Sequence, residues 1–204
     1  MLCRFLILLL CLPILPSPGF SQGTSPATYQ HSATGISFPA RLGPLTYRGN
    51  VDYAKQGRAD LGVAVRYGLA GAPVWADIYL YDLGRKNLGT GLDSPEVQKA
   101  FMGAVQDIFG MEKQGVYKSV QKTEEGKFAL NTQSGRLNML WAHFTYERLP
   151  GPQISSPGPL ISDLYLTAYK DQFLKIRFTS PAAMQDRHQE ALQKFLVDFG
   201  KVLK

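Results

Sequence analysis

Residues 74–83 read VWADIYLYDL, and this stretch decides the fold. Small and aliphatic side chains alternate in it with aromatic and polar ones. Because successive side chains of a β-strand point to opposite faces of the sheet, the alternation predicts a central strand with one aliphatic and one aromatic-polar face. The aliphatic side holds Val74, Ala76, Ile78 and Leu80, and the other side holds Trp75, Asp77, Tyr79 and Tyr81.

The stretch before this strand repeats the division. In residues 59–67, Leu, Val and Tyr alternate with Gly, Ala and Arg. A slip of one residue in an antiparallel pair would exchange the two faces, so the pairing must keep aliphatic opposite aliphatic. A four-residue loop over residues 69–72 meets this condition and places Val65 opposite Ala76. We therefore predict a hairpin with that pairing.

A second hairpin is predicted from residues 160–169 and 173–180, which also alternate. A three-residue loop over residues 170–172 keeps its aliphatic side chains on one face. A two-residue loop would instead set Lys175 and Arg177 against Ala168 and Leu166, charged side chains beside apolar ones. We therefore predict the three-residue loop, and with it one aliphatic face across both hairpins.

Two helices follow from the spacing of apolar residues. Ser94 is a favourable N-cap and Pro95 a favourable first residue for a helix over residues 94–109. Residues 182–203 carry a second apolar stripe at helical spacing. The other alternating stretches predict strands, so the fold class is α+β, with a largely antiparallel sheet of six to eight strands. Both helices are expected to cover the aliphatic face.

The chain begins with a predicted signal peptide over residues 1–21. Arg4 precedes an apolar run over residues 5–15, and Ser21 offers a small side chain near the cleavage point. The apolar run is too short to span a bilayer as a mature helix, so we expect no transmembrane span in the mature chain. The predicted location is therefore the periplasm or the secreted fraction.

The mature chain is predicted to be a flexible leader followed by one domain. Residues 22–34 are rich in Ser, Thr and Gln without periodicity, and His31 within them is expected to be solvated. Residues 35–204 form the single α+β domain. Cys3 and Cys11 both fall in the signal peptide, so the mature domain would contain neither a disulfide nor a catalytic thiolate.

The charged residues are dispersed along the chain. The formal net charge is +6, and removal of Arg4 with the signal peptide lowers it to +5. Readers of nucleic acid usually cluster their Lys and Arg, so we predict no nucleic-acid partner. The glycine-rich loop before the first helix contains Arg85 and Lys86, which at a helix N-terminus are candidates for anion binding. The alternative is that this loop is an ordinary solvent-facing turn.

No complete catalytic set is visible. A hydrolase could use His143 with Asp77 or Asp163, but no serine in a tight strand-to-helix turn accompanies them. The three histidines of the chain lack the spacing of metal ligands, so we predict no metal and no cofactor. Whether the protein is an enzyme stays open, and the balance favours a non-catalytic protein.

The best candidate for function is the aromatic-polar face of the predicted sheet. Aromatic rings mixed with charges suit a polysaccharide, a small ligand or a partner protein of the cell envelope. The alternative is that a helix or the N-terminal segment covers this face and that its charges pair with one another. The oligomeric state is not predicted. The candidate ligand-binding residues are Trp75, Asp77, Tyr79, Trp141, His143, Asp163, Tyr165 and Arg177.

The order of elements resembles a known fold. An early hairpin, a helix begun by Ser94 and Pro95, a meander ending in FLKIRF at residues 173–178 and a C-terminal helix together resemble the Mog1/PsbP-like fold. The resemblance covers residues 35–204. It implies an α/β/α sandwich, with helices on both sheet faces, and a binding or assembly factor without catalysis. Through VWADIYLYDLG the chain also resembles uncharacterised secreted proteins of Gram-negative bacteria.

Overall fold

The computed structural model describes residues 28–89, 91–150 and 157–204. The predicted signal peptide, residues 1–21, therefore lies outside the described residues. Within them, neither helix combines the length and the apolar character needed to cross a membrane.

One antiparallel sheet of eight strands forms the centre of the fold, and a small sheet of two strands lies beside it. The strand order of the large sheet is β3-β4-β5-β6-β10-β9-β8-β7. The α+β class predicted from the sequence is therefore confirmed. The strands are β1 (Tyr29–Gln30), β2 (Ser37–Phe38), β3 (Arg41–Leu42), β4 (Leu45–Asp52), β5 (Val63–Gly68), β6 (Trp75–Tyr81), β7 (Tyr117–Thr132), β8 (Gly135–Arg148), β9 (Gly158–Tyr169) and β10 (Gln172–Pro181).

The two predicted helices are present. Helix α1 spans Pro95–Lys113, and the Ser94 hydroxyl accepts a hydrogen bond from the Val97 backbone N–H at its start. Helix α2 spans Gln185–Val202 and follows the short 3-10 turn Ala182–Met184. Two further 3-10 turns, Tyr53–Gln56 and Ala59–Leu61, connect β4 to β5.

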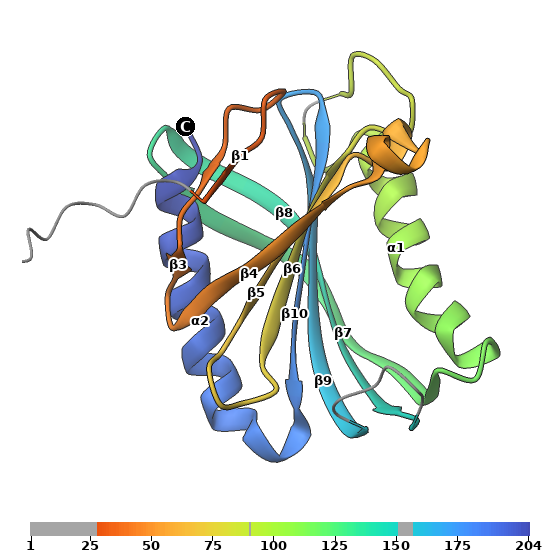
Figure 1. Cartoon of the computed structure of the whole chain (residues 1–204). Coiled ribbons are helices and arrows are strands. Elements are labelled where there is room, and N and C mark those ends of the chain that lie inside the picture. Colours follow the sequence, from red (N-terminus) through yellow and green to blue (C-terminus); the bar gives the residue numbers. More distant parts are fainter. Residues whose placement is uncertain (1–27, 90, 151–156) are drawn as a thin grey trace, which may run out of the picture.

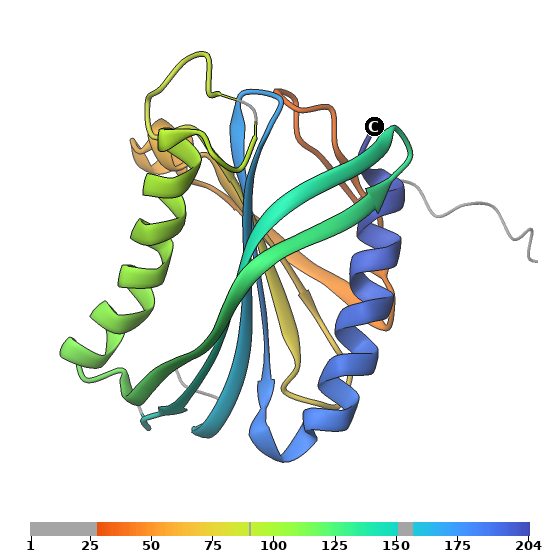
Figure 2. The same cartoon turned by 180° about the vertical axis from the view of Figure 1, so that it is seen from behind.

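The helices cover opposite faces of the sheet, as Figures 1 and 2 show. We call these faces the α1 face and the α2 face. Helix α1 packs in an apolar cluster with Phe144 and Leu166, whereas α2 packs in a separate cluster with Ile78 and Phe178. The expectation that both helices share one aliphatic face is therefore wrong. The molecule is an α/β/α sandwich with an apolar layer on each side of the sheet.

The turn between β9 and β10 explains this difference. It has two residues, Lys170 and Asp171, both with positive φ (49° and 56°), and it pairs Lys175 with Leu166. The predicted three-residue loop is therefore wrong, and Ile78 and Leu166 lie on opposite faces. Two-residue turns of this kind usually carry a glycine, and this one does not, so its sequence gave no signal of the register.

The first hairpin keeps the predicted faces but not the predicted pairing. Val65 pairs with Ile78 and not with Ala76, a shift of two residues. A shift of two leaves every side chain on its face, because the side-chain period of a strand is two. It also brings Arg66 directly opposite Asp77.

Two strands have irregular pairing. Strand β7 runs unbroken through residues 123–126, and its register against β8 shifts between Lys122 and Glu124. Strand β4 runs through Gly49 and Asn50, and its register against β5 shifts between Tyr47 and Gly49. Such a shift is typical of a β-bulge, in which one strand contains an extra residue.

The part of the predicted leader that the structure describes, residues 28–34, is folded. Strand β1 pairs with β2, and the His31 ring is buried with its Nδ1 2.9 Å from the Thr34 hydroxyl. The expectation of a flexible segment with a solvated histidine is therefore wrong for these residues. We predicted flexibility from the polar composition of the segment, but its first strand forms a short hairpin with β2 that packs on the large sheet.

Candidate functional site

The candidate ligand-binding residues do not form one surface. The two-residue turn between β9 and β10 divides them between the two faces of the sheet. The prediction of a single aromatic-polar surface is therefore wrong. Trp75, Asp77, Tyr79 and Arg177 lie on the α1 face, and Trp141, His143, Asp163 and Tyr165 lie on the α2 face.

The first group lines a polar cavity of about 430 Å³ on the α1 face. Three guanidinium groups line this cavity, from β5, β8 and β10. We call it the arginine pocket. Its charged and aromatic residues are Arg66, Trp75, Asp77, Tyr79, Tyr117, Arg148 and Arg177.

Arg177 forms one wall of the arginine pocket. Its guanidinium donates hydrogen bonds to the hydroxyls of Ser162 (3.2 Å), Tyr146 (2.9 Å) and Tyr117 (3.3 Å). No carboxylate among the described residues forms an ion pair with it. Burial lowers the pKa of Arg177, but Tyr146 and Tyr117 more than offset this, so the pKa is raised and the group is charged.

The pocket also contains one carboxylate, which is already paired. Asp77 is buried and accepts two hydrogen bonds from Arg66, at 2.6 and 3.0 Å. Arg66 reaches this position from the surface, since 61% of its side chain is exposed. The fork-to-fork geometry matches guanidinium to carboxylate and leaves Asp77 little capacity to neutralise a second cation.

Arg148 is the third arginine of the pocket. Its guanidinium lies 5.8 Å from the centre of the Trp75 ring, in cation–π geometry. Its Nε–H is buried and, among the described residues, has no hydrogen-bond partner. A buried donor without a partner costs about 1–3 kcal/mol. The pocket therefore contains two guanidinium groups, those of Arg148 and Arg177, that form no ion pair with a carboxylate in the part of the chain that the structure describes.

The second group of candidate residues belongs to a buried cluster on the α2 face. Asp163 accepts a hydrogen bond from Trp141 Nε1 (2.9 Å) and contacts His143 Nδ1 (3.0 Å) through Oδ1. Its Oδ2 contacts His188 Nε2 (2.5 Å), and His188 Nδ1 lies 2.8 Å from the Ser180 hydroxyl. We call these five residues the His–Asp cluster.

The charges of the His–Asp cluster balance one another. Burial raises the pKa of Asp163, but hydrogen bonds with His143 and His188 outweigh it, and the pKa falls to about 2. The same contact raises the pKa of His143, against the effect of burial. Each buried polar atom of the cluster therefore has a hydrogen-bond partner, and the contacts of His188 connect α2 to the sheet.

The His–Asp cluster contains a Ser–His–Asp sequence of contacts, which bears on the hydrolase alternative. His143 contacts Asp163, whereas Asp77 lies on the other face. Ser180 and His188 are both 0% exposed, so no substrate can reach the hydroxyl. Among the described residues, no group of three or more His, Cys, Asp or Glu could hold a metal ion.

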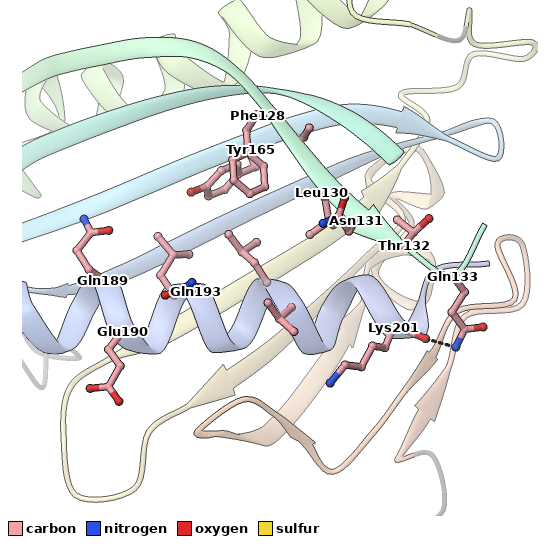
Figure 3. Close-up of a pocket in the computed structure, with 14 residues that line it drawn as sticks. Phe128, Leu130, Asn131, Thr132, Gln133, Tyr165, Gln189, Glu190, Gln193 and Lys201 are labelled. Carbon is pink, nitrogen blue, oxygen red and sulfur yellow. Dashed lines mark hydrogen bonds between the residues drawn. The ribbon is translucent and has the colours of Figure 1, made fainter. Parts of the chain in front are cut away.

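A second cavity, of about 900 Å³, lies between α2 and β7 on the α2 face (Figure 3). The Tyr165 ring, a predicted ligand contact, packs on Phe128 at its inner wall, with ring centroids 5.1 Å apart. Leu192, Leu196 and Val197 of α2 add apolar side chains. Among the described residues that line this cavity, none has a buried charged group without a partner, so the cavity gives less indication of a particular ligand than the arginine pocket.

The residues of the predicted anion loop separate. Arg85 lines a third cavity, next to α1, whereas Lys86 is exposed and lines none of the three cavities. Arg148 and Tyr117 were not among the predicted site residues. Arg148 lies two residues after Tyr146 on β8, so both side chains are on the same face of the sheet. The alternation of the strand sequence could therefore have indicated Arg148.

The fold and the pocket define an α+β sandwich with a cationic cavity on one sheet face. Comparisons with family models, curated proteins and solved structures find no match for this chain.

Proposed function

We propose that this protein is a secreted or periplasmic binding module, without catalysis of its own, that holds a small anionic ligand in the arginine pocket. The observation that carries the proposal is the unmatched positive charge of Arg148 and Arg177, together with the buried Arg148 Nε–H that has no partner among the described residues. An anionic ligand would supply the counter-charge that these two guanidinium groups lack among the described residues.

The chemistry of the walls narrows the class of ligand. Guanidinium groups bind carboxylate and phosphate oxygens through two parallel hydrogen bonds. Trp75 and Tyr117 offer aromatic surface beside those groups. A cavity of about 430 Å³ lies within the usual range for small-molecule sites. A planar or apolar body with one anionic group therefore fits this pocket better than a neutral sugar.

Calorimetric titration with phenyl phosphate, benzoate and neutral benzamide tests the proposal. We expect at least one anion to bind and benzamide to bind at least about 10-fold more weakly, because it forms no charge-assisted hydrogen bonds. Arg148→Gln should weaken the binding of the anion by a similar factor. Arg136→Gln, which removes an exposed arginine of the same strand outside the pocket, is the matched control. Equal binding of benzamide, equal loss in both variants, or no binding of either anion would contradict the proposal.

The compartment is a separate part of the proposal and has its own test. It is supported by the Arg4-led apolar run and the small residue Ser21. Expression of the full chain in a Gram-negative host, followed by fractionation and N-terminal sequencing, should give a periplasmic product cleaved near Ser21. A product that keeps Met1 and stays in the cytoplasm would contradict it.

A further inference from the structure

The third cavity is lined by a lysine on the α1 face. It has a volume of about 420 Å³ and lies between α1 and strands β6 and β10. Its wall contains the aromatic rings of Tyr81 and Phe173 and the small residues Ala100 and Ala104 of α1. Lys175 of β10 projects into this mainly apolar space. We call it the Lys175 cavity.

The ammonium group of Lys175 is held by rings and not by a carboxylate. Its Nζ lies 4.2 Å from the centre of the Tyr79 ring and 5.5 Å from that of Tyr81. Among the described residues, no Asp or Glu forms an ion pair with it. Burial lowers the pKa of Lys175, while the carboxylate of Asp107 acts in the opposite direction. A cation at the base of an apolar cavity without a counter-ion is a site for an anionic group.

The charges at the edge of the cavity do not supply that counter-ion. Arg85 and Lys99 lie there together with Glu96 and Asp107, so the two signs balance. Glu96 is held by the Ser94 hydroxyl, at 2.6 Å, at the start of α1. The unbalanced charge of the cavity is therefore that of Lys175.

We infer that the Lys175 cavity binds an apolar monocarboxylate, with its carboxylate at Lys175 and its hydrocarbon body against Tyr81 and Phe173. The arginine pocket is polar and the Lys175 cavity mainly apolar, so the two sites select different anions. Tyr79 borders both cavities. The inference does not rest on the function proposed for the arginine pocket.

Titration of the full mature chain with octanoate and with 1-octanol tests the inference. We expect octanoate to bind about 10-fold or more tightly than octanol, because only the carboxylate pairs with Lys175. Lys175→Met should remove this preference and leave the weak binding of octanol unchanged. Equal affinities for the two probes in the unmodified protein, or an unchanged preference in Lys175→Met, would overturn the inference.

A second variant narrows the cavity and keeps the lysine. Gly103 of α1 lines the cavity, and a Cβ added there meets no atom within 4 Å, so the fold should accommodate Gly103→Leu. We expect it to weaken octanoate and octanol alike. Arg148→Gln should change neither, which separates this site from the arginine pocket. Octanoate binding that Gly103→Leu leaves intact would place the ligand elsewhere, for example in the apolar cavity of Figure 3, and would overturn the inference.

Discussion

The His–Asp cluster and the arginine pocket bury charges on opposite faces of the same sheet, and they balance those charges differently. In the cluster, the Asp163 carboxylate is hydrogen-bonded to Trp141, His143 and His188, so both of its oxygens have partners. In the pocket, neither Arg148 nor Arg177 forms an ion pair with a carboxylate among the described residues. A fully satisfied network specifies a packed structure, whereas a partly satisfied one costs stability. On the function proposed above, the closed network serves the stability of the fold and the open one serves binding.

The largest effect is expected from breaking the closed network. Asp163→Ala removes the carboxylate that links α2 to the sheet and leaves buried donors of Trp141 and His188 without a partner. We expect the free energy of unfolding to fall by about 3–5 kcal/mol. Urea unfolding followed by circular dichroism measures it. Asp60→Ala, which removes an exposed aspartate paired with Arg58, should leave the midpoint unchanged. A loss under about 1 kcal/mol for Asp163→Ala would show that the cluster does not hold α2.

A smaller effect of opposite sign is expected from the open network. Arg148→Met removes a buried donor that has no partner among the described residues and keeps an unbranched chain beside Trp75. We expect the free energy of unfolding to rise by about 1 kcal/mol, since the desolvation cost of that N–H disappears. Arg136→Met should change it by less than about 0.5 kcal/mol. Clear destabilisation by Arg148→Met would mean that the pocket, like the cluster, serves the fold.

The sequence predicts the elements better than their arrangement. The alternation in residues 74–83 gives the two faces of β6 correctly, and Ser94 with Pro95 gives the start of α1. The side of the sheet on which β9 and β10 present their residues depends on the turn at Lys170 and Asp171. That turn has positive φ at two residues without glycine, so local sequence could not reveal it.

The same turn decides how much of the candidate site was predictable. Trp75, Asp77 and Arg177 were named from their alternation and do meet in one pocket. A charged side chain of β10 opposite an apolar one of β9 looked unfavourable, because the sequence does not show that the rings of Tyr79 and Tyr81 lie beside the Lys175 ammonium group. Contacts across elements distant in the chain, such as Ser180 with His188, depend on which face α2 covers. Periodicity within a strand carries no such information.

The smallest expected effect is the change of stability with pH that the His–Asp cluster causes. The hydrogen bond that the His143 ring donates to the Asp163 carboxylate raises the pKa of His143 above its usual 6.5, so the charged form is favoured in the folded state. The stability that this contact contributes is fully present below pH 6.5 and is lost as pH rises through the raised value. The pKa of Asp163 is lowered to about 2, so its contribution is present above pH 3.8 and is lost as pH falls towards 2. The cluster should stabilise the fold most between these limits.

Urea midpoints at pH 5.5 and 8.5 measure the upper limb of this profile, and His143→Gln should reduce the difference between them. His31 acts in the opposite direction, because burial lowers its pKa and its charging at acid pH disfavours the fold. Both proteins retain His31, so its contribution cancels when the variant is compared with the unmodified chain. If the urea midpoints at pH 5.5 and 8.5 differ by the same amount in both proteins, the charge of His143 does not stabilise Asp163. His188 and Trp141 would then be the partners of the Asp163 carboxylate that stabilise the cluster.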